Sequence, residues 1–217
     1  MRVTTHAEAV KFVDRAGFAF VFPERRMPLP SLWGAVCGDP RREMEEEDWG
    51  WTSAVGRTWD LKVALAAKRR VYVGRAFRGK PSLVSLAMLP ALRATIGDPF
   101  RGLSDDARRA YERLSNVGAM STLRLRESLG WHGPKGRAKF DRLLPELYRR
   151  LLIATVGTDG TETRWPAGVV STTERAFPGL AKPRDAKTTL VARFRATAPD
   201  ATDRQIEGVL GLRLDRP

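Results

Sequence analysis

Residues 133–150, GPKGRAKFDRLLPELYRR, decide the fold prediction because they have the pattern of a single amphipathic helix with a cationic outer face. Phe140, Leu143, Leu144, Leu147 and Leu151 follow the i, i+3, i+4, i+7, i+11 pattern, which at about 100° per residue makes one apolar stripe. Lysine and arginine side chains occupy the opposite side. One face is therefore expected to be buried, and the other either binds a partner or only faces water.

The segments around this helix predict a winged helix-turn-helix. Ser104 can cap a preceding helix that ends near Gly118, and Ser121 can cap a second, short one. The run LLIATVGTDGTETRWPAGVV, residues 151–170, follows as two strand-like stretches joined at Asp159-Gly160. Three helices and then a β-hairpin is the order in which a recognition helix precedes a wing. Pro145 is expected to kink the recognition helix in its second half.

The first hundred residues predict a repeat of this plan. Thr5 and Glu8 have the spacing of a capping box, and a second, short helix is expected around PSLWGAV, residues 30–36. Thr58 is expected to cap a third helix, WDLKVALAAKRR, before a hairpin with Arg78-Gly79-Lys80 at its tip. The C-terminal part predicts two further helices, the second capped by Thr202.

The predicted fold class is mainly α with small β-hairpins, built from tandem winged helix-turn-helix modules. The expected domains are a winged-helix-like module over residues 1–100, a winged helix-turn-helix module over residues 101–177, and a C-terminal helix pair over residues 178–217 that packs on the others.

Positive charge is concentrated in two of these segments. The chain carries a net charge of +13, and residues 57–80 hold eight basic side chains against Asp60 alone, while residues 135–150 hold six against two acidic ones. Lysine and arginine displace the counterions that condense on nucleic-acid phosphates. The alternative is a solvated basic surface that only keeps the protein soluble. The predicted nucleic-acid-binding residues are Lys62, Arg69, Arg70, Arg75, Arg78, Lys80, Lys135, Arg137, Lys139, Arg142, Arg149 and Arg164.

Other classes of protein and of site find little support in the sequence. No apolar run approaches the roughly 18 residues of a membrane span, and the N-terminus lacks the apolar region of a secretory signal. We therefore expect a cytoplasmic protein with no membrane partner. Cys37 is the only cysteine, and His6 and His132 have no metal-ligand spacing, so neither a metal nor another cofactor is expected. The sequence does not indicate the oligomeric state.

An acidic run and a group of tryptophans leave room for an enzyme. Residues 43–48 contain five carboxylates, which suit a divalent cation but more often face water. Trp49 and Trp51 follow this run and could stack on unpaired bases, whereas Trp33 and Trp59 are expected in the core.

Residues 118–157, GAMSTLRLRESLGWHGPKGRAKFDRLLPELYRRLLIATVG, resemble the winged-helix segment of the AlkZ-like (YcaQ-type) DNA glycosylases. The upstream stretches FAFVFP, PSLWGAV and DWGWT resemble the short AlkZ-related branch of that superfamily. The resemblance implies tandem winged helices and a role in DNA repair or regulation. Glycosylase activity in the superfamily is attached to a Gln-apolar-Gln or Gln-apolar-Asp motif. The only glutamine here is Gln205, and we interpret Gln205-Ile206-Glu207 as a coincidence, so the activity is not carried over and the catalytic residues are unknown.

The sequence thus predicts a protein that binds double-stranded or distorted DNA through basic helices and wings. Two alternatives stay open. One is a residual glycosylase-type enzyme with a non-standard site, in a pocket lined by Trp49, Trp51 and the acidic run. The other is a protein-interaction scaffold whose charge is incidental. Whether the chain is an enzyme is left open, with the absence of activity favoured.

Overall fold

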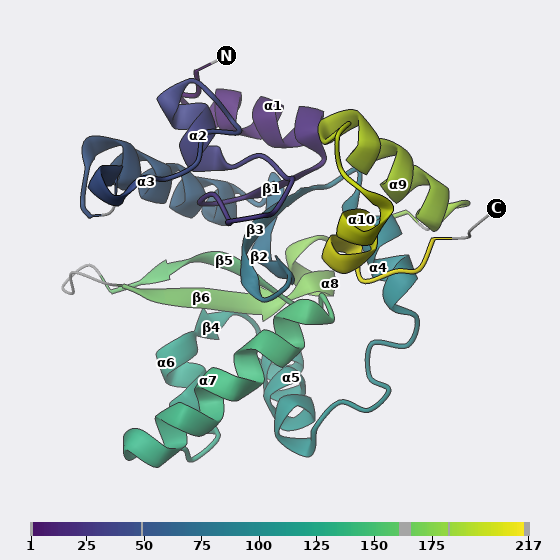
Figure 1. Cartoon of the computed structure of the whole chain (residues 1–217). Helices are drawn as coiled ribbons and strands as arrows, with labels where there is room; N and C mark the ends of the chain where they lie inside the picture. Colours follow the sequence, from purple (N-terminus) through teal and green to yellow (C-terminus); the bar gives the residue numbers. More distant parts are fainter. Residues whose placement is uncertain (1, 49, 161–165, 182, 215–217) are drawn as a thin grey trace.

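One antiparallel sheet runs through the molecule (Figure 1). A computed structural model describes residues 2–48, 50–160, 166–181 and 183–214. In this part of the chain the sheet has six strands, and its first three come from the N-terminal hundred residues. In order across the sheet the strands are β1 (Phe18–Phe20), β3 (Lys80–Ser85), β2 (Val71–Phe77), β5 (Ile153–Asp159), β6 (Ala167–Thr172) and β4 (Met120–Ser121).

The predicted fold class, mainly α with tandem winged-helix modules, is wrong. The two expected hairpins exist as β2–β3 and β5–β6, but they do not stand apart as two wings. Val73 of β2 pairs with Thr155 of β5, and the buried Tyr72 hydroxyl donates to the Ile153 carbonyl at 3.0 Å. A hairpin edge carries unpaired backbone groups, and pairing two edges satisfies both. The sheet joins the first two predicted domains, and the division at residues 100 and 177 stays a prediction.

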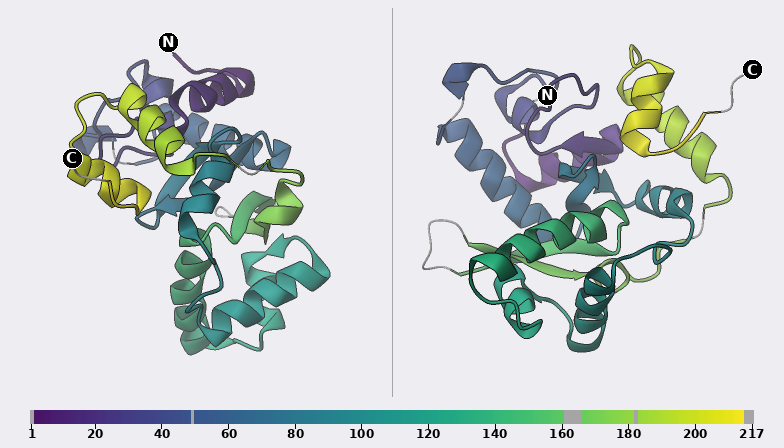
Figure 2. Two further views of the ribbon diagram at one scale, coloured as in Figure 1. Left: turned by 90° about the vertical axis from the view of Figure 1, so that its right-hand side faces the viewer. Right: turned by 60° about the horizontal axis from the view of Figure 1, so that its bottom comes forward.

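Two sets of three helices pack against the two halves of the sheet (Figures 1 and 2). One set surrounds a core that includes Leu65, Val73 and Leu83, and the other surrounds a core that includes Leu147 and Val170. The first set is α1 (His6–Ala16), α2 (Leu32–Cys37) and α3 (Ser53–Lys68), against β1, β3 and β2; the second is α5 (Asp105–Val117), α6 (Thr122–Ser128) and α7 (Gly133–Arg149), against β5, β6 and β4.

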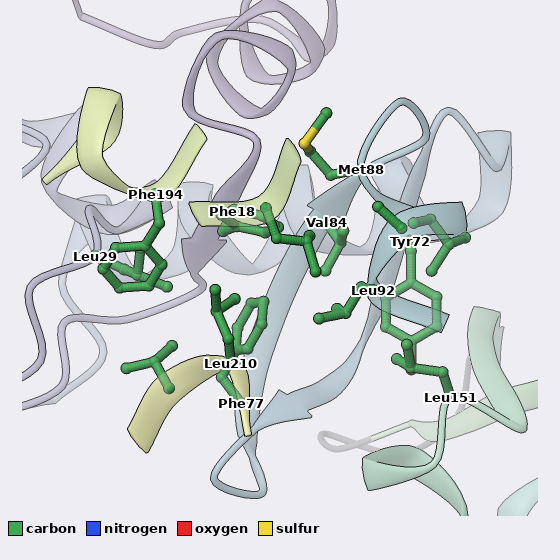
Figure 3. Close-up of a cluster of buried hydrophobic side chains, with 14 of the residues drawn as sticks. Phe18, Leu29, Tyr72, Phe77, Val84, Met88, Leu92, Leu151, Phe194 and Leu210 are labelled. Atoms are coloured by element: carbon green, nitrogen blue, oxygen red, sulfur yellow. The ribbon is translucent and has the colours of Figure 1, made fainter. Parts of the chain in front are cut away.

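A third core lies between the sheet and four further helices, two of which are the C-terminal pair (Figure 3). Phe194 is fully buried and contacts Phe18 of β1 with ring centroids 6.3 Å apart, while Leu210 lies near Phe77. Residues from both ends of the chain therefore share one core. The four helices are α4 (Leu89–Ile96), α8 (Thr173–Ala176), α9 (Ala186–Thr197) and α10 (Asp203–Leu210); a short 3₁₀ helix, η1, spans Glu46–Asp48.

Most of the helix starts follow from capping side chains. Ser104, Ser121 and Thr202 each accept a hydrogen bond from a backbone N–H in the first turn of their helix, and Thr5 forms the expected capping box with Glu8. The prediction that Thr58 starts a helix is wrong. Helix α3 begins earlier, with Thr52 as its N-cap, and the buried Thr58 hydroxyl donates to the Ala54 carbonyl inside the helix.

No helix of the described residues has the length and apolar character needed to cross a membrane.

We expect Tyr72→Phe to lower the free energy of unfolding by about 1–2 kcal/mol, because it removes a buried hydrogen bond between β2 and β5 without opening a large cavity. Urea unfolding followed by circular dichroism measures the change. Tyr111→Phe is the control, since this hydroxyl lies at the surface, 3.4 Å from Glu174. Equal effects of the two variants would mean that the Tyr72 bond does not hold the halves of the sheet together.

Candidate nucleic-acid interface

Helix α7 presents the cationic face that the sequence predicts. Phe140, Leu143 and Leu147 are buried against the rest of the fold, while Lys135, Arg142 and further cations on the other side are exposed. The helix continues through Pro145 to Arg149. Trp131 lies just before the helix and packs on Phe140 with ring centroids 6.4 Å apart, which fixes the N-terminal half of α7 on the body of the protein.

A groove of about 570 Å³, the α5–α7 groove, borders α7 on one side. Lys135, Lys139 and Arg142 line it. Lys139 forms an ion pair with Asp106, whose carboxylate lies 2.9 Å from its Nζ, and the Nζ also lies 4.5 Å from the centroid of the Trp131 ring. Lys135 and Arg142 have no carboxylate partner among the described residues. Their charge is therefore available to an anionic ligand.

Ser104 and Glu146 also line this groove. Glu146 accepts hydrogen bonds from the backbone N–H and the hydroxyl of Ser104, at 3.0 and 2.7 Å. Ser104 also caps α5. The contact joins the start of α5 to the second half of α7.

A second cavity, the α3–α7 cleft, lies on the other side of α7, where β2 meets β5. Its volume is about 400 Å³. Lys62 of α3 and Arg75 of β2 line it together with Asp141, Tyr148 and Thr155 from the second half of the chain; the other lining residues are Val73, Gly74, Pro81, Thr122, Leu144, Pro145 and Gly168. The Tyr148 hydroxyl and the Thr155 hydroxyl lie 2.8 Å apart and hold α7 to β5. Cations from one half of the sequence thus face α7 from the other half.

Lys62 is the most perturbed cation of the cleft. It lies on the half-buried side of α3, with its Nζ 4.0 Å from the centroid of the Trp59 ring. Burial, and then the charge of Arg75, lowers the pKa of Lys62 to about 8. Both effects disfavour the ammonium form, so the amine loses its proton far more easily than that of an exposed lysine.

The remaining predicted residues lie on several other surfaces. Arg137 is exposed and lies 3.8 Å from Asp141, and Lys80 forms an ion pair of 2.9 Å with Glu24. Arg149 donates to the Pro145 carbonyl, one turn earlier in α7. Arg69 and Arg70 follow the end of α3, and Arg164 lies outside the described residues.

Arg78 is part of a third basic surface, which cannot be recognised in the sequence. It lines an open groove of about 850 Å³ together with Arg26, Arg204 and Arg213, beside α10. These four arginines come from three distant parts of the chain. No local sequence pattern could have grouped them, because the segment of Arg26, the β2–β3 hairpin and the α10 region meet only in the folded chain.

Gln205 and Glu207 have structural roles. The Gln205 side chain completes a capping box with Thr202, and Glu207 accepts a hydrogen bond from the backbone N–H of Leu214 at 2.7 Å. Ile206 between them is fully buried. Both polar side chains thus stabilise the ends of α10.

The acidic run is largely exposed. Asp48 pairs with Arg42 at 3.1 Å, and Trp51 is 59% exposed, while Trp49 lies outside the described residues. The described part of the chain contains no group of three or more histidine, cysteine, aspartate or glutamate side chains placed to hold a metal ion.

The burial of the other two predicted core tryptophans differs, and Cys37 is partly buried. Trp33 is fully buried, as predicted, whereas Trp59 is only half-buried and forms the ring beneath Lys62. Burial raises the pKa of the Cys37 thiol, which disfavours the reactive thiolate.

We expect Gly136→Ala to destabilise the start of α7. A Cβ at this position would lie 2.5 Å from the backbone carbonyl carbon of Trp131, so the turn before the helix must move. Overpacking of this kind costs about 1–3 kcal/mol, which thermal unfolding can measure. Gly208→Ala is the control, because a Cβ there meets nothing within 4 Å and alanine favours a helix. Similar stabilities of the two variants would mean that the close approach of Gly136 to the Trp131 backbone does not contribute to the stability of the turn.

Comparison with curated proteins and with solved structures gave no match. One family model, described as AlkZ related, matches residues 3–211. Both halves of the sheet, the two cavities beside α7 and the C-terminal helix pair lie within the matched residues. On this match, the chain belongs to the AlkZ-related family.

Proposed function

We propose that the protein binds double-stranded or distorted DNA with α7 at the centre of the interface. The interface consists of Lys135, Lys139 and Arg142 in the α5–α7 groove, of Lys62 and Arg75 in the α3–α7 cleft, and of Arg137, the partner of the cleft residue Asp141. The observation that carries the proposal is the position of α7 between two cavities, each lined by cations. A duplex lying along α7 would meet positive charge on both of its sides.

The dimensions of α7 suit a DNA groove. A helix of 17 residues is about 25 Å long, and the major groove is about 12 Å wide, enough to admit a helix. Lys135 and Arg142 are seven residues apart, which places them about 10 Å apart along the helix axis. Exposed cations at such intervals can each reach a different phosphate while the helix lies in the groove between the strands.

Some cations of the proposed interface have carboxylate partners and others have none, and this difference supports the proposed DNA-binding surface. Lys139 and Arg137 have carboxylate partners, whereas Lys135, Arg142, Lys62 and Arg75 have none among the described residues. The four unpaired cations lie on three different elements around α7, which favours a ligand with many phosphates over one small anion. Arg69, Arg70, Arg78, Lys80, Arg149 and Arg164 stay predictions as outer contacts.

Membership of the AlkZ-related family supports a DNA partner, since the family is named for its relation to the AlkZ-like DNA glycosylases. A role in DNA repair or regulation follows as part of the proposal.

Fluorescence anisotropy with a labelled 20-base-pair duplex tests the proposal. If about five phosphates are contacted, the logarithm of the binding constant should fall with the logarithm of salt concentration with a slope of about −4 to −5. A duplex with a central bulge shows whether distortion strengthens binding. Absence of binding at micromolar protein and low salt would contradict the proposal.

A further inference from the structure

Lys62 combines three properties that phosphate binding alone does not require. Its side chain lines a cleft of about 400 Å³, its Nζ lies 4.0 Å from the centroid of the Trp59 ring, and it has no carboxylate partner among the described residues. A lysine that only contacts phosphate needs none of this, because an exposed side chain with full charge binds phosphate better. Desolvation and a neighbouring cation are the two features that turn a lysine into a nucleophile toward carbonyl groups.

The groups around Lys62 reinforce this chemistry. Arg75 of β2 faces it as the neighbouring cation, and α7 contributes the Asp141 carboxylate and the Tyr148 hydroxyl. Arg137 is the partner of Asp141, at 3.8 Å, and burial raises the pKa of Tyr148, so this hydroxyl stays neutral. Thr122 and Thr155 add uncharged hydroxyls. The cleft therefore offers an amine, an anion-binding guanidinium and a carboxylate within one cavity.

We propose that Lys62 is a nucleophile that forms an imine with the C1′ aldehyde of an abasic site in DNA. The inference rests on the proposed function, because the DNA-binding surface is what brings a sugar aldehyde to the cleft. An abasic nucleotide is the fitting substrate class: it is the form of DNA that carries an aldehyde, and, lacking a base, it leaves the stack at little cost. Arg75 is placed to bind a phosphate beside the reacting sugar.

The reaction balances without any other reactant. The lone pair of the neutral Lys62 amine forms the Nζ–C1′ bond, and the aldehyde oxygen leaves as water with the two protons that the nitrogen loses. Overall, an ammonium group and an aldehyde give a protonated imine and water, so no electron is transferred. With a pKa of about 8, roughly a tenth of Lys62 is neutral at pH 7, far more than of an exposed lysine.

Reductive trapping tests the inference. Full-length protein is incubated with a labelled duplex that contains one abasic site, sodium cyanoborohydride is added, and the covalent complex is separated on a denaturing gel. Peptide mapping by mass spectrometry then identifies the modified residue. We expect a complex with this duplex, modified at Lys62, and none with a duplex that carries a tetrahydrofuran analogue, which has no aldehyde.

Two variants of Lys62 show whether trapping depends on the amine itself or only on its positive charge. Lys62→Arg and Lys62→Gln are both expected to lower the yield at least 100-fold, although arginine keeps the positive charge. Lys11→Arg, at an exposed position on α1, is the control and is expected to keep the wild-type yield. Folding of each variant is checked by circular dichroism, and the peptide map of the wild type tests the assignment without any variant.

The pH dependence gives a second readout. Protonation at low pH removes the nucleophile, so the initial rate should rise about 50-fold from pH 6 to pH 8 and then level off. A rate that still rises about eightfold between pH 9 and pH 10 would indicate an ordinary surface lysine and overturn the assignment.

Binding of the tetrahydrofuran duplex, measured by anisotropy, distinguishes the two proposals. If this duplex is bound and no covalent complex forms, or if the complex maps to another amine, the inference is overturned while the proposed function stands. If no duplex is bound, both are overturned.

Discussion

Replacing Lys135 and Arg142 together by glutamate is expected to lower the affinity for a DNA duplex by at least about 100-fold at 0.1 M salt. Each substitution removes one phosphate contact and adds a negative charge beside the DNA backbone. Both side chains are exposed and have no carboxylate partner among the described residues, so the change should leave the fold intact. Fluorescence anisotropy measures the affinity, and circular dichroism checks the fold.

The salt dependence of the same variant gives an independent check. Loss of two phosphate contacts should make the slope of log K against log salt shallower by about two units. The control is Lys11→Glu with Arg25→Glu, which changes the net charge equally at exposed positions outside the proposed interface. If the control weakens binding as much, only the net charge matters and α7 is not the interface.

Replacing Phe194 by alanine is expected to lower the free energy of unfolding by about 3–5 kcal/mol. The Phe194 ring is fully buried, contacts Phe18 of β1, and belongs to the core shared by α9, α10 and the sheet. Alanine leaves a large cavity at the point where the C-terminal helices meet the sheet. Denaturant unfolding followed by circular dichroism measures the loss.

Val117→Ala is the control for this core variant. Val117 ends α5 and is 55% exposed, so its truncation should change the free energy of unfolding by less than about 0.5 kcal/mol. A loss below 1 kcal/mol for Phe194→Ala would mean that α9 and α10 contribute little to the stability of the sheet.

Local patterns in the sequence predicted most of the helices and both hairpins. The apolar stripe of α7 and the cap at Ser104 are signals that lie within a few residues of the element they specify, so they can be recognised without the fold. Thr58 shows the limit of such signals. It has the form of a cap, but the apolar face of α3 begins at Val55, and burial against the sheet extends the helix upstream.

The joining of the two hairpins could not be predicted in this way. Val73 and Thr155 are far apart in the sequence, and nothing in either hairpin shows which edge will pair with which. The resulting sheet is why the prediction of tandem winged helices failed. The buried Tyr72 hydroxyl was the nearest signal, since such a group needs a partner, but the sequence does not show that its partner is Ile153.

Some features of the candidate site can be predicted from local sequence patterns, and others depend on the fold. The exposed cations of α7 follow from its periodicity, and the sequence predicted them. Lys62 was predicted as a phosphate-facing residue, yet its position in a cleft beside Arg75 and Asp141 depends on the pairing of β2 with β5. The partner of Lys139, Asp106, likewise comes from a different helix.

Lysine footprinting shows whether DNA binds around α7. The protein is acetylated with a mild amine reagent in the presence and absence of a saturating duplex, and modification is read at each lysine by mass spectrometry. We expect DNA to protect Lys62, Lys135 and Lys139 several-fold and to leave Lys11 unchanged. Protection of Lys11 with continued reaction of Lys135 and Lys139 would contradict this expectation, because the DNA would then lie on the α1 side of the molecule.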